Sequence, residues 1–138
     1  MGMRYLLDTH TFIWLMLSPE RLAEPMRAHL KSSSQHRLVS SVTAMEATTK
    51  HRLGKLPEVA PLMPQGAWNG ALYRLMADPL SITTEHALLA GSLDWSHKDP
   101  FDRLLAAQAM IEDVPLVSVD TAFSSLPGLR VVWADPGI

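Results

Sequence analysis

The stretch HKDPFDRLLAAQA at residues 97–109, followed by LVSVD at residues 116–120, decides the fold class that we predict for this chain. Asp99-Pro100 is typical of a helix start, because aspartate is a good N-cap and proline is favoured in the first turn. We expect this helix to end near Glu112. The short apolar run after it has the length and composition of a buried strand. A helix that leads into a buried strand is the repeating unit of an α/β protein.

The same alternation of helices and short strands extends through the rest of the chain. We predict strands at Arg4–Leu7, Arg37–Ser40, Pro115–Val119 and Arg130–Trp133. Cap and turn signals predict a helix opened by Ser18-Pro19, one capped by Ser41 and ending at Gly54, one capped by Thr84 and beginning at Glu85, and one more within residues 57–79. Strands that alternate with helices require right-handed crossovers, so the sheet should be mostly parallel with helices on both faces.

Length and composition describe one domain without disulfides. With 138 residues the chain can bury a hydrophobic core, so we treat 1–138 as a single domain. The sequence has no cysteine, which excludes thiolate metal sites and is compatible with a reducing cytoplasm. The longest apolar run, Phe12 to Leu17, is far shorter than the roughly 20 residues that cross a bilayer. We therefore expect a soluble, cytoplasmic protein with no membrane partner.

Two aspartates directly follow predicted strands. Asp8 comes after Tyr5-Leu6-Leu7, and Asp120 comes after LVSV. Ligands of open parallel sheets bind beyond the carboxyl ends of the strands, so both carboxylates are candidates for a functional site. The alternative is that each aspartate only caps the next helix, which for either residue alone is the better explanation.

Glu46 occupies an unusual place on its predicted helix. An apolar stripe formed by Val42, Met45 and Leu53 should face the core, and Glu46 lies four residues after Val42. A buried carboxylate is costly unless it is paired, protonated or bound to a cation, so we interpret Glu46 as a site residue. The alternative is an edge position from which the carboxylate reaches water or Lys50.

Asp102 repeats this pattern in the first turn of its helix. Leu105, Ala106 and Ala109 follow it on the same face and form a small-residue stripe that lets the helix pack closely on the sheet. A favourable interaction with the helix N-terminus explains an acid there equally well. Asp99, as the predicted N-cap, is ranked as an auxiliary acid.

Four converging acids would suit a hard divalent cation. Mg²⁺ prefers carboxylate oxygens and keeps several waters, so it needs a few acids rather than a closed cage. The formal charge of −2 also indicates that basic side chains alone would not account for nucleic-acid binding, unless they gather on one face. The histidines lack zinc-ligand spacing and are not predicted as metal ligands: His10, His29, His36, His51, His86 and His97.

Taken together, these stretches resemble the PIN-domain ribonucleases, and among them the VapC-type toxins of toxin–antitoxin pairs. The similar stretches occur in the family's order and cover nearly the whole chain: YLLDTH at 5–10, SSVTAMEATTKHRLGKL at 40–56, HKDPFDRLLAAQA at 97–109 and LVSVDTAF at 116–123. The third of them is the most specific.

The resemblance implies a three-layer α/β/α fold and a Mg²⁺- or Mn²⁺-dependent endoribonuclease that uses a metal-activated water. It assigns catalysis and metal binding to Asp8, Glu46, Asp102 and Asp120, with Asp99 and Ser118 as auxiliary residues. We interpret three basic residues as contacts to flanking RNA phosphates: Lys50, Arg52 and Arg103. The implied partners are RNA, a small antitoxin and a second copy of the chain in a homodimer.

Two other functions stay open at this point. One is a catalytically silent PIN-like module that binds RNA or protein. The other is a phosphatase of the aspartyl-phosphate kind, because Asp8-Thr9 follows a strand. The similar motif of the haloacid dehalogenases has a second aspartate two residues after the first, and His10 at that position argues against this function. Residues 57–79 correspond to the variable middle of the family and diverge too far from it to indicate which RNA is cleaved.

Overall fold

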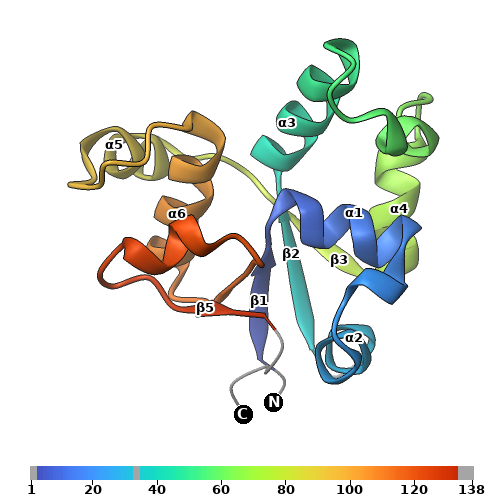
Figure 1. Ribbon diagram of the computed structural model, residues 1–138, viewed down its shortest axis with the longest axis horizontal. Coiled ribbons are helices and arrows are strands. Elements are labelled where there is room, and N and C mark those ends of the chain that lie inside the picture. The colour runs from blue at the N-terminus through green and yellow to red at the C-terminus, as the bar shows by residue number, and fades with distance from the viewer. Residues whose placement is uncertain (1–2, 33–34, 134–138) are drawn as a thin grey trace.

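The computed structural model describes residues 3–32 and 35–133, so the ends of the predicted domain, 1–2 and 134–138, lie outside it. Its centre is a sheet in which every strand pair is parallel, in the order β3-β2-β1-β4-β5 (Figure 1). The strands are β1 Arg4–Leu7, β2 His36–Ser40, β3 Ala77–Leu80, β4 Leu116–Val117 and β5 Val131–Val132. The predicted α/β class with a mostly parallel sheet is confirmed.

Helices cover both faces of this sheet. In Figure 1, α1, α2 and α4 lie on one side of the strands and α5 and α6 on the other, which makes three layers. The α-helices are α1 Thr9–Leu17, α2 Glu24–Lys31, α3 Ser41–Arg52, α4 Ala67–Leu75, α5 Thr84–Ser92 and α6 Pro100–Glu112. Shorter 3₁₀ segments are η1 Pro19–Arg21, η2 Pro57–Leu62 and η3 Thr121–Ser125.

Side-chain alternation along β1 builds two hydrophobic cores. Tyr5 and Leu7 point to the core beneath α1, α2 and α4, whereas Leu6 points to the core beneath α6. Ala106 and Ala109 are fully or almost fully buried in the second core, so α6 approaches the sheet closely, as its small-residue stripe predicted. This close approach carries the N-terminus of α6 to the carboxyl end of the sheet.

Several predicted boundaries were wrong. Ser40 and Thr83, rather than Ser41 and Thr84, are the N-caps of α3 and α5, because their side chains accept hydrogen bonds from the N–H groups of Val42 and His86. Ser18-Pro19 opens only the 3₁₀ turn η1. The edge strand β3 was not predicted; it contains Pro79, which an edge strand tolerates but a central strand does not.

Within the described residues, no helix combines the length and the apolar composition needed to cross a bilayer.

Candidate active site

A pocket of about 250 Å³ lies at the carboxyl end of the sheet, where β1 and β4 run side by side. Five carboxylates line it: Asp8, Glu46, Asp99, Asp102 and Asp120. The other lining residues are Thr9, His10, Lys50, His97, Val119 and Phe123. All four predicted catalytic acids and the auxiliary Asp99 therefore face one cavity, although they come from four separate stretches of the chain.

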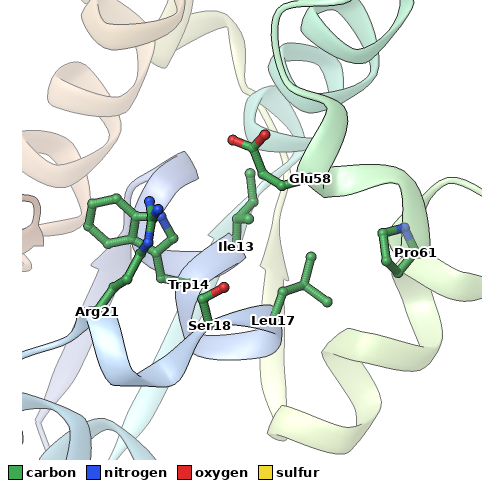
Figure 2. A pocket seen from close by; sticks show the side chains of 7 residues that line it. All are labelled: Ile13, Trp14, Leu17, Ser18, Arg21, Glu58 and Pro61. Atoms are coloured by element: carbon green, nitrogen blue, oxygen red, sulfur yellow. The ribbon is translucent and has the colours of Figure 1, made fainter.

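A larger pocket of about 400 Å³ lies beside α1 and differs in chemistry (Figure 2). Its lining mixes apolar and polar residues, and Glu58 is the one acid among the described residues that form it. The Arg21 guanidinium lies over the indole ring of Trp14, 5.4 Å from the ring centroid. This pocket lacks a set of acids that converge, so we place the candidate site in the first one.

Asp8 and Asp120 have both roles that the sequence left open. Asp8 Oδ1 accepts a hydrogen bond from the Thr11 N–H at 2.8 Å and caps α1, and Asp120 Oδ1 accepts from the Ala122 N–H at 2.9 Å and caps η3. Both side chains also line the pocket. Asp8 is buried, whereas Asp120 is exposed and lies three residues beyond the short strand β4. Capping orients one oxygen of each carboxylate and so helps to fix the group at the cavity.

Ser118 links these two aspartates. Its hydroxyl accepts a hydrogen bond from the Asp120 N–H at 3.0 Å, and its side chain also hydrogen bonds to the Asp8 carboxylate. Ser118 is buried. The predicted auxiliary serine thus lies in direct contact with site acids.

Glu46 is buried, but the predicted apolar stripe around it was wrong. Met45 is 60% exposed and Leu53 is 51% exposed, so neither faces the core. The inward face of α3 carries Val42, Thr43, Glu46 and Ala47 instead. The inward face of α3 is therefore mixed, with polar Thr43 and Glu46 beside apolar Val42 and Ala47.

Both oxygens of Glu46 have close partners. Thr9 Oγ1 donates to Oε1 at 2.5 Å, and the Lys50 ammonium donates to Oε2 at 2.5 Å. Burial lowers the pKa of Lys50, but the hydrogen bond and charge of Glu46, with the charges of Asp99 and Asp102, raise it overall. Lys50 therefore stays protonated and places its positive charge among the site acids.

Asp102 and Asp99 stand together at the N-terminus of α6. Asp99 Oδ1 accepts from the Asp102 N–H at 3.0 Å and is the N-cap, as predicted. Asp102 Oδ2 accepts from His97 Nε2 at 2.7 Å. The two carboxylates repel each other, and a cation bound beside them would relieve that repulsion.

Burial dominates the electrostatics of two site acids. It raises the pKa of Asp8 despite hydrogen bonds from Ser118 and Thr11 that lower it. Burial also raises the pKa of Asp102 to about 6; the His97 hydrogen bond opposes the shift, and the charges of Asp99 and Glu46 add to it. The ionised forms of Asp8 and Asp102 therefore cost folding free energy at neutral pH.

We expect the metal-free protein to lose stability through Asp102 as the pH rises from about 3.8 to about 6. Its folded pKa of about 6 lies above the ordinary 3.8, so the folded state holds this proton more tightly than the unfolded chain does. The resulting stability is fully present below the ordinary value and is lost as the pH rises through about 6. Thermal melts in EDTA should show a smaller pH dependence for Asp102→Asn than for wild type. Asp94→Asn, at an exposed position, is the matched control. An unchanged pH dependence in Asp102→Asn would contradict the shift.

The donor chemistry of the pocket fits Mg²⁺ or Mn²⁺, since the acids offer carboxylate oxygens and two of them have raised pKa values. As placed, however, no three Asp, Glu or His side chains in residues 3–32 and 35–133 lie close enough to hold one metal ion. The Lys50 ammonium and His97 instead contact Glu46 and Asp102. Metal binding would therefore require local side-chain movement, with Lys50 as the cation to be displaced from Glu46.

The three basic residues predicted to contact RNA have different environments. Lys50 lines the pocket, and Arg52 is exposed at the end of α3. Arg103 donates four hydrogen bonds to backbone carbonyl oxygens of its own chain. Because these bonds occupy most of its N–H donors, Arg103 holds backbone of its own chain and is not placed to contact RNA, contrary to the prediction.

Sequence reasoning missed Thr9, His10 and His97 as lining residues of the site. Thr9 and His10 directly follow Asp8, so their position beside the first acid was the available signal. His97 carried no such signal, because it precedes α6 and its contact with Asp102 depends on the path of the preceding loop.

Comparison with known proteins identifies a family and a fold. The family model described as PIN domain matches residues 5–129. A solved structure of VapBC2 from Rickettsia felis, bound to a DNA fragment from its promoter, contains a chain similar to this one with TM-score 0.67 and 17% identity, over 95% of this chain and 99% of that one. A chain of DNA-bound VapBC from Salmonella typhimurium is similar with TM-score 0.66 and 22% identity, over 94% of this chain and 97% of that one.

A toxin–antitoxin complex from Klebsiella pneumoniae gives TM-score 0.61 and 16% identity over 95% of this chain and 98% of that one. Identities this low establish the shared fold alone. No curated protein shows a significant match to the sequence.

Proposed function

From the premise that this chain belongs to the PIN domain family, we propose that it is a metal-dependent endoribonuclease toxin. The observation that supports this best is the convergence of five carboxylates on one pocket at the carboxyl end of a parallel sheet. Four of those acids, Asp8, Glu46, Asp99 and Asp102, are buried or half-buried, and buried carboxylates cost stability unless hydrogen bonds, an ion pair or a bound cation compensate them. A cation and the phosphodiester that it accompanies are ligands of the required chemistry.

In this proposal the acids hold Mg²⁺ or Mn²⁺, and the side chains around them orient the substrate. Asp8, Asp102, Glu46 and Asp120 are the proposed ligands, and Asp99 adds negative charge beside them. The bound metal would lower the pKa of an attacking water and stabilise charge on the phosphate. Ser118 holds the Asp8 carboxylate in place, and Thr9 holds Glu46.

Lys50 is the proposed contact to a phosphate next to the scissile one. Its ammonium lies at the pocket with 30% of the side chain exposed, so it can turn from Glu46 toward a bound anion. Arg52, two residues further along α3, is a second proposed phosphate contact.

We also propose a small antitoxin as partner and a homodimer as the assembly. The three similar structures are of VapBC or of a toxin–antitoxin complex, and this chain shares their fold over at least 94% of its length. Co-expression with the product of an adjacent small gene, followed by size-exclusion chromatography with light scattering, tests both points. A chain that stays monomeric and binds no such product would contradict them.

A specific observation keeps a catalytically silent binding module as the second candidate. Lys50 already pairs with Glu46, and His97 already contacts Asp102, so both acids have partners without a metal. A silent module would bind RNA equally well with and without Mg²⁺.

We expect the protein to cleave single-stranded RNA in Mg²⁺ or Mn²⁺, to stop cleaving it in EDTA, and not to recover with Zn²⁺ alone. The reason is that an all-oxygen ligand set favours hard cations. Gel analysis of a labelled RNA gives the readout, and sequencing of the product ends gives the cleaved sites. Undiminished cleavage in excess chelator would contradict the metal mechanism, and binding without cleavage in every metal would favour the silent module.

A further inference from the structure

Arg103 organises the loop that joins α5 to α6. Its Nε donates to the Ala90 carbonyl at 2.8 Å, and its Nη2 donates to the Leu93 carbonyl at 2.7 Å. Its Nη1 donates to the carbonyls of Trp95 at 2.8 Å and His97 at 2.9 Å. A planar guanidinium with several donors suits this task, because one side chain can hold several carbonyls in a fixed relative position. The backbone carbonyl of His97 is therefore tied to α6.

Trp95 packs against the ring of His97. The two ring centroids lie 4.9 Å apart, and the Trp95 ring lies 6.0 Å from that of Phe123 in η3. The Trp95 indole Nε1–H donates to Ser125 Oγ at 2.9 Å. Aromatic contacts of this kind add to the free energy of packing, and the hydrogen bond limits rotation of the indole. The imidazole is thus held by its backbone and by its ring.

Held in this way, the His97 ring contacts a site acid. Its Nε2 lies 2.7 Å from Asp102 Oδ2, and the two side chains are 29% and 17% exposed. Asp102 and Arg103 are neighbours on α6, so one helix turn carries both the carboxylate and the side chain that secures its partner. Nothing in the capping of α6 requires this contact, since Asp99 already caps the helix through the Asp102 N–H.

We propose that His97 is a positioning residue that fixes the orientation of the Asp102 carboxylate in the pocket, with Arg103 and Trp95 as its supports. This rests on the proposed function, because it matters only if Asp102 takes part in holding a metal. The His97 Nε2–H occupies one oxygen of Asp102 and sets the direction of the other. Hydrogen-bond partners of ligating carboxylates typically change metal affinity or activity by about 10–100-fold when they are removed.

Two substitutions at His97 separate the hydrogen bond from the packing. His97→Phe keeps a ring against Trp95 but has no donor, and His97→Gln keeps an N–H donor near Nε2 but has no ring. We expect Mn²⁺ affinity, measured by calorimetry on the purified full chain, to fall by about 10–100-fold in His97→Phe and to stay much closer to wild type in His97→Gln. RNA cleavage should fall in the same order, mainly through kcat.

The support is tested separately at Arg103. Arg103→Lys keeps the positive charge, but an ammonium cannot hydrogen bond to all four carbonyls at once as the planar guanidinium does. We therefore expect Arg103→Lys to lower Mn²⁺ affinity, as His97→Phe does. Arg74→Lys, at an exposed position on α4, is the matched control and should bind Mn²⁺ as wild type does. Circular dichroism confirms that each variant is folded; if Arg103→Lys is not, the two His97 variants decide the question.

The outcomes distinguish this inference from the proposed function. If wild type binds Mn²⁺ and folded His97→Phe binds it equally well, His97 does not position Asp102 and the inference is overturned. Equal losses in His97→Phe and His97→Gln would also overturn it, because the hydrogen bond would then not be the cause. If wild type itself binds no Mn²⁺, the metal mechanism fails, and this inference fails with it.

Discussion

Asp8→Asn is expected to abolish RNA cleavage and, at neutral pH, to raise the melting temperature of the metal-free protein. Burial raises the pKa of Asp8, so its ionised form is unfavourable in the folded state. An amide carries no charge, and its oxygen can still accept the Thr11 N–H hydrogen bond that caps α1. Cleavage should fall at least about a thousandfold, or roughly 4 kcal/mol of transition-state stabilisation, because a proposed metal ligand loses its charge.

Thermal melts with and without Mg²⁺ separate this expectation from a capping role alone. A bound metal stabilises the folded state by mass action, so Mg²⁺ should raise the melting temperature of wild type more than that of Asp8→Asn. Asp94→Asn serves as control at an exposed position and should respond to Mg²⁺ as wild type does. Equal Mg²⁺ responses of wild type and Asp8→Asn would remove Asp8 from the site.

Glu46→Gln should lower cleavage by a similar factor of at least about a thousand while the protein stays folded. The amide keeps the shape of the side chain and its contact with Thr9. It removes the negative charge that pairs with Lys50 and that would bind the proposed metal. Stability should fall only modestly, because Lys50 is partly exposed and its ammonium can turn to water.

A double-mutant cycle with Lys50→Met measures how strongly the two side chains are coupled. Lys50→Met alone leaves the buried Glu46 carboxylate without its cation, so it should destabilise the metal-free protein. The two single effects should not add, with a coupling free energy of about 1–3 kcal/mol. Wild-type cleavage by a folded Glu46→Gln protein would show that Glu46 acts only as the partner of Lys50.

The fold was predictable where local signals in the sequence are strong. Asp99-Pro100 sets the start of α6, and the stripe of Leu105, Ala106 and Ala109 is buried as its spacing indicates. The boundaries of β1 were also correct, because a short apolar run before an aspartate leaves few alternatives. Caps at Ser40 and Thr83 were misplaced by one residue, since adjacent hydroxyl residues offer the same cap in sequence.

The convergence of the site acids was predictable from the geometry of a parallel sheet. Residues that follow parallel strands meet at one edge of the sheet, so Asp8 and Asp120 had to lie near each other once the strands were recognised. Glu46 and Asp102 were placed toward the core by helical spacing, although Met45 and Leu53 proved to face solvent. Whether these acids bind metal stays a prediction.

By itself, the sequence determined the layer architecture and the set of acids, because periodicity, caps and strand ends are properties of short segments. Only the tertiary structure decided which groups contact those acids. The contact of Lys50 with Glu46 was foreseeable, because the two residues are four apart on one helix. The contact of Thr9 with Glu46 was not, because Thr9 lies on a different helix. The contact between His97 and Asp102 depends on a loop whose path Arg103 holds. Hydrogen-bond partners are chosen by distance and direction in the packed chain, and a side chain such as Arg103 has many possible acceptors until folding brings particular carbonyls within reach.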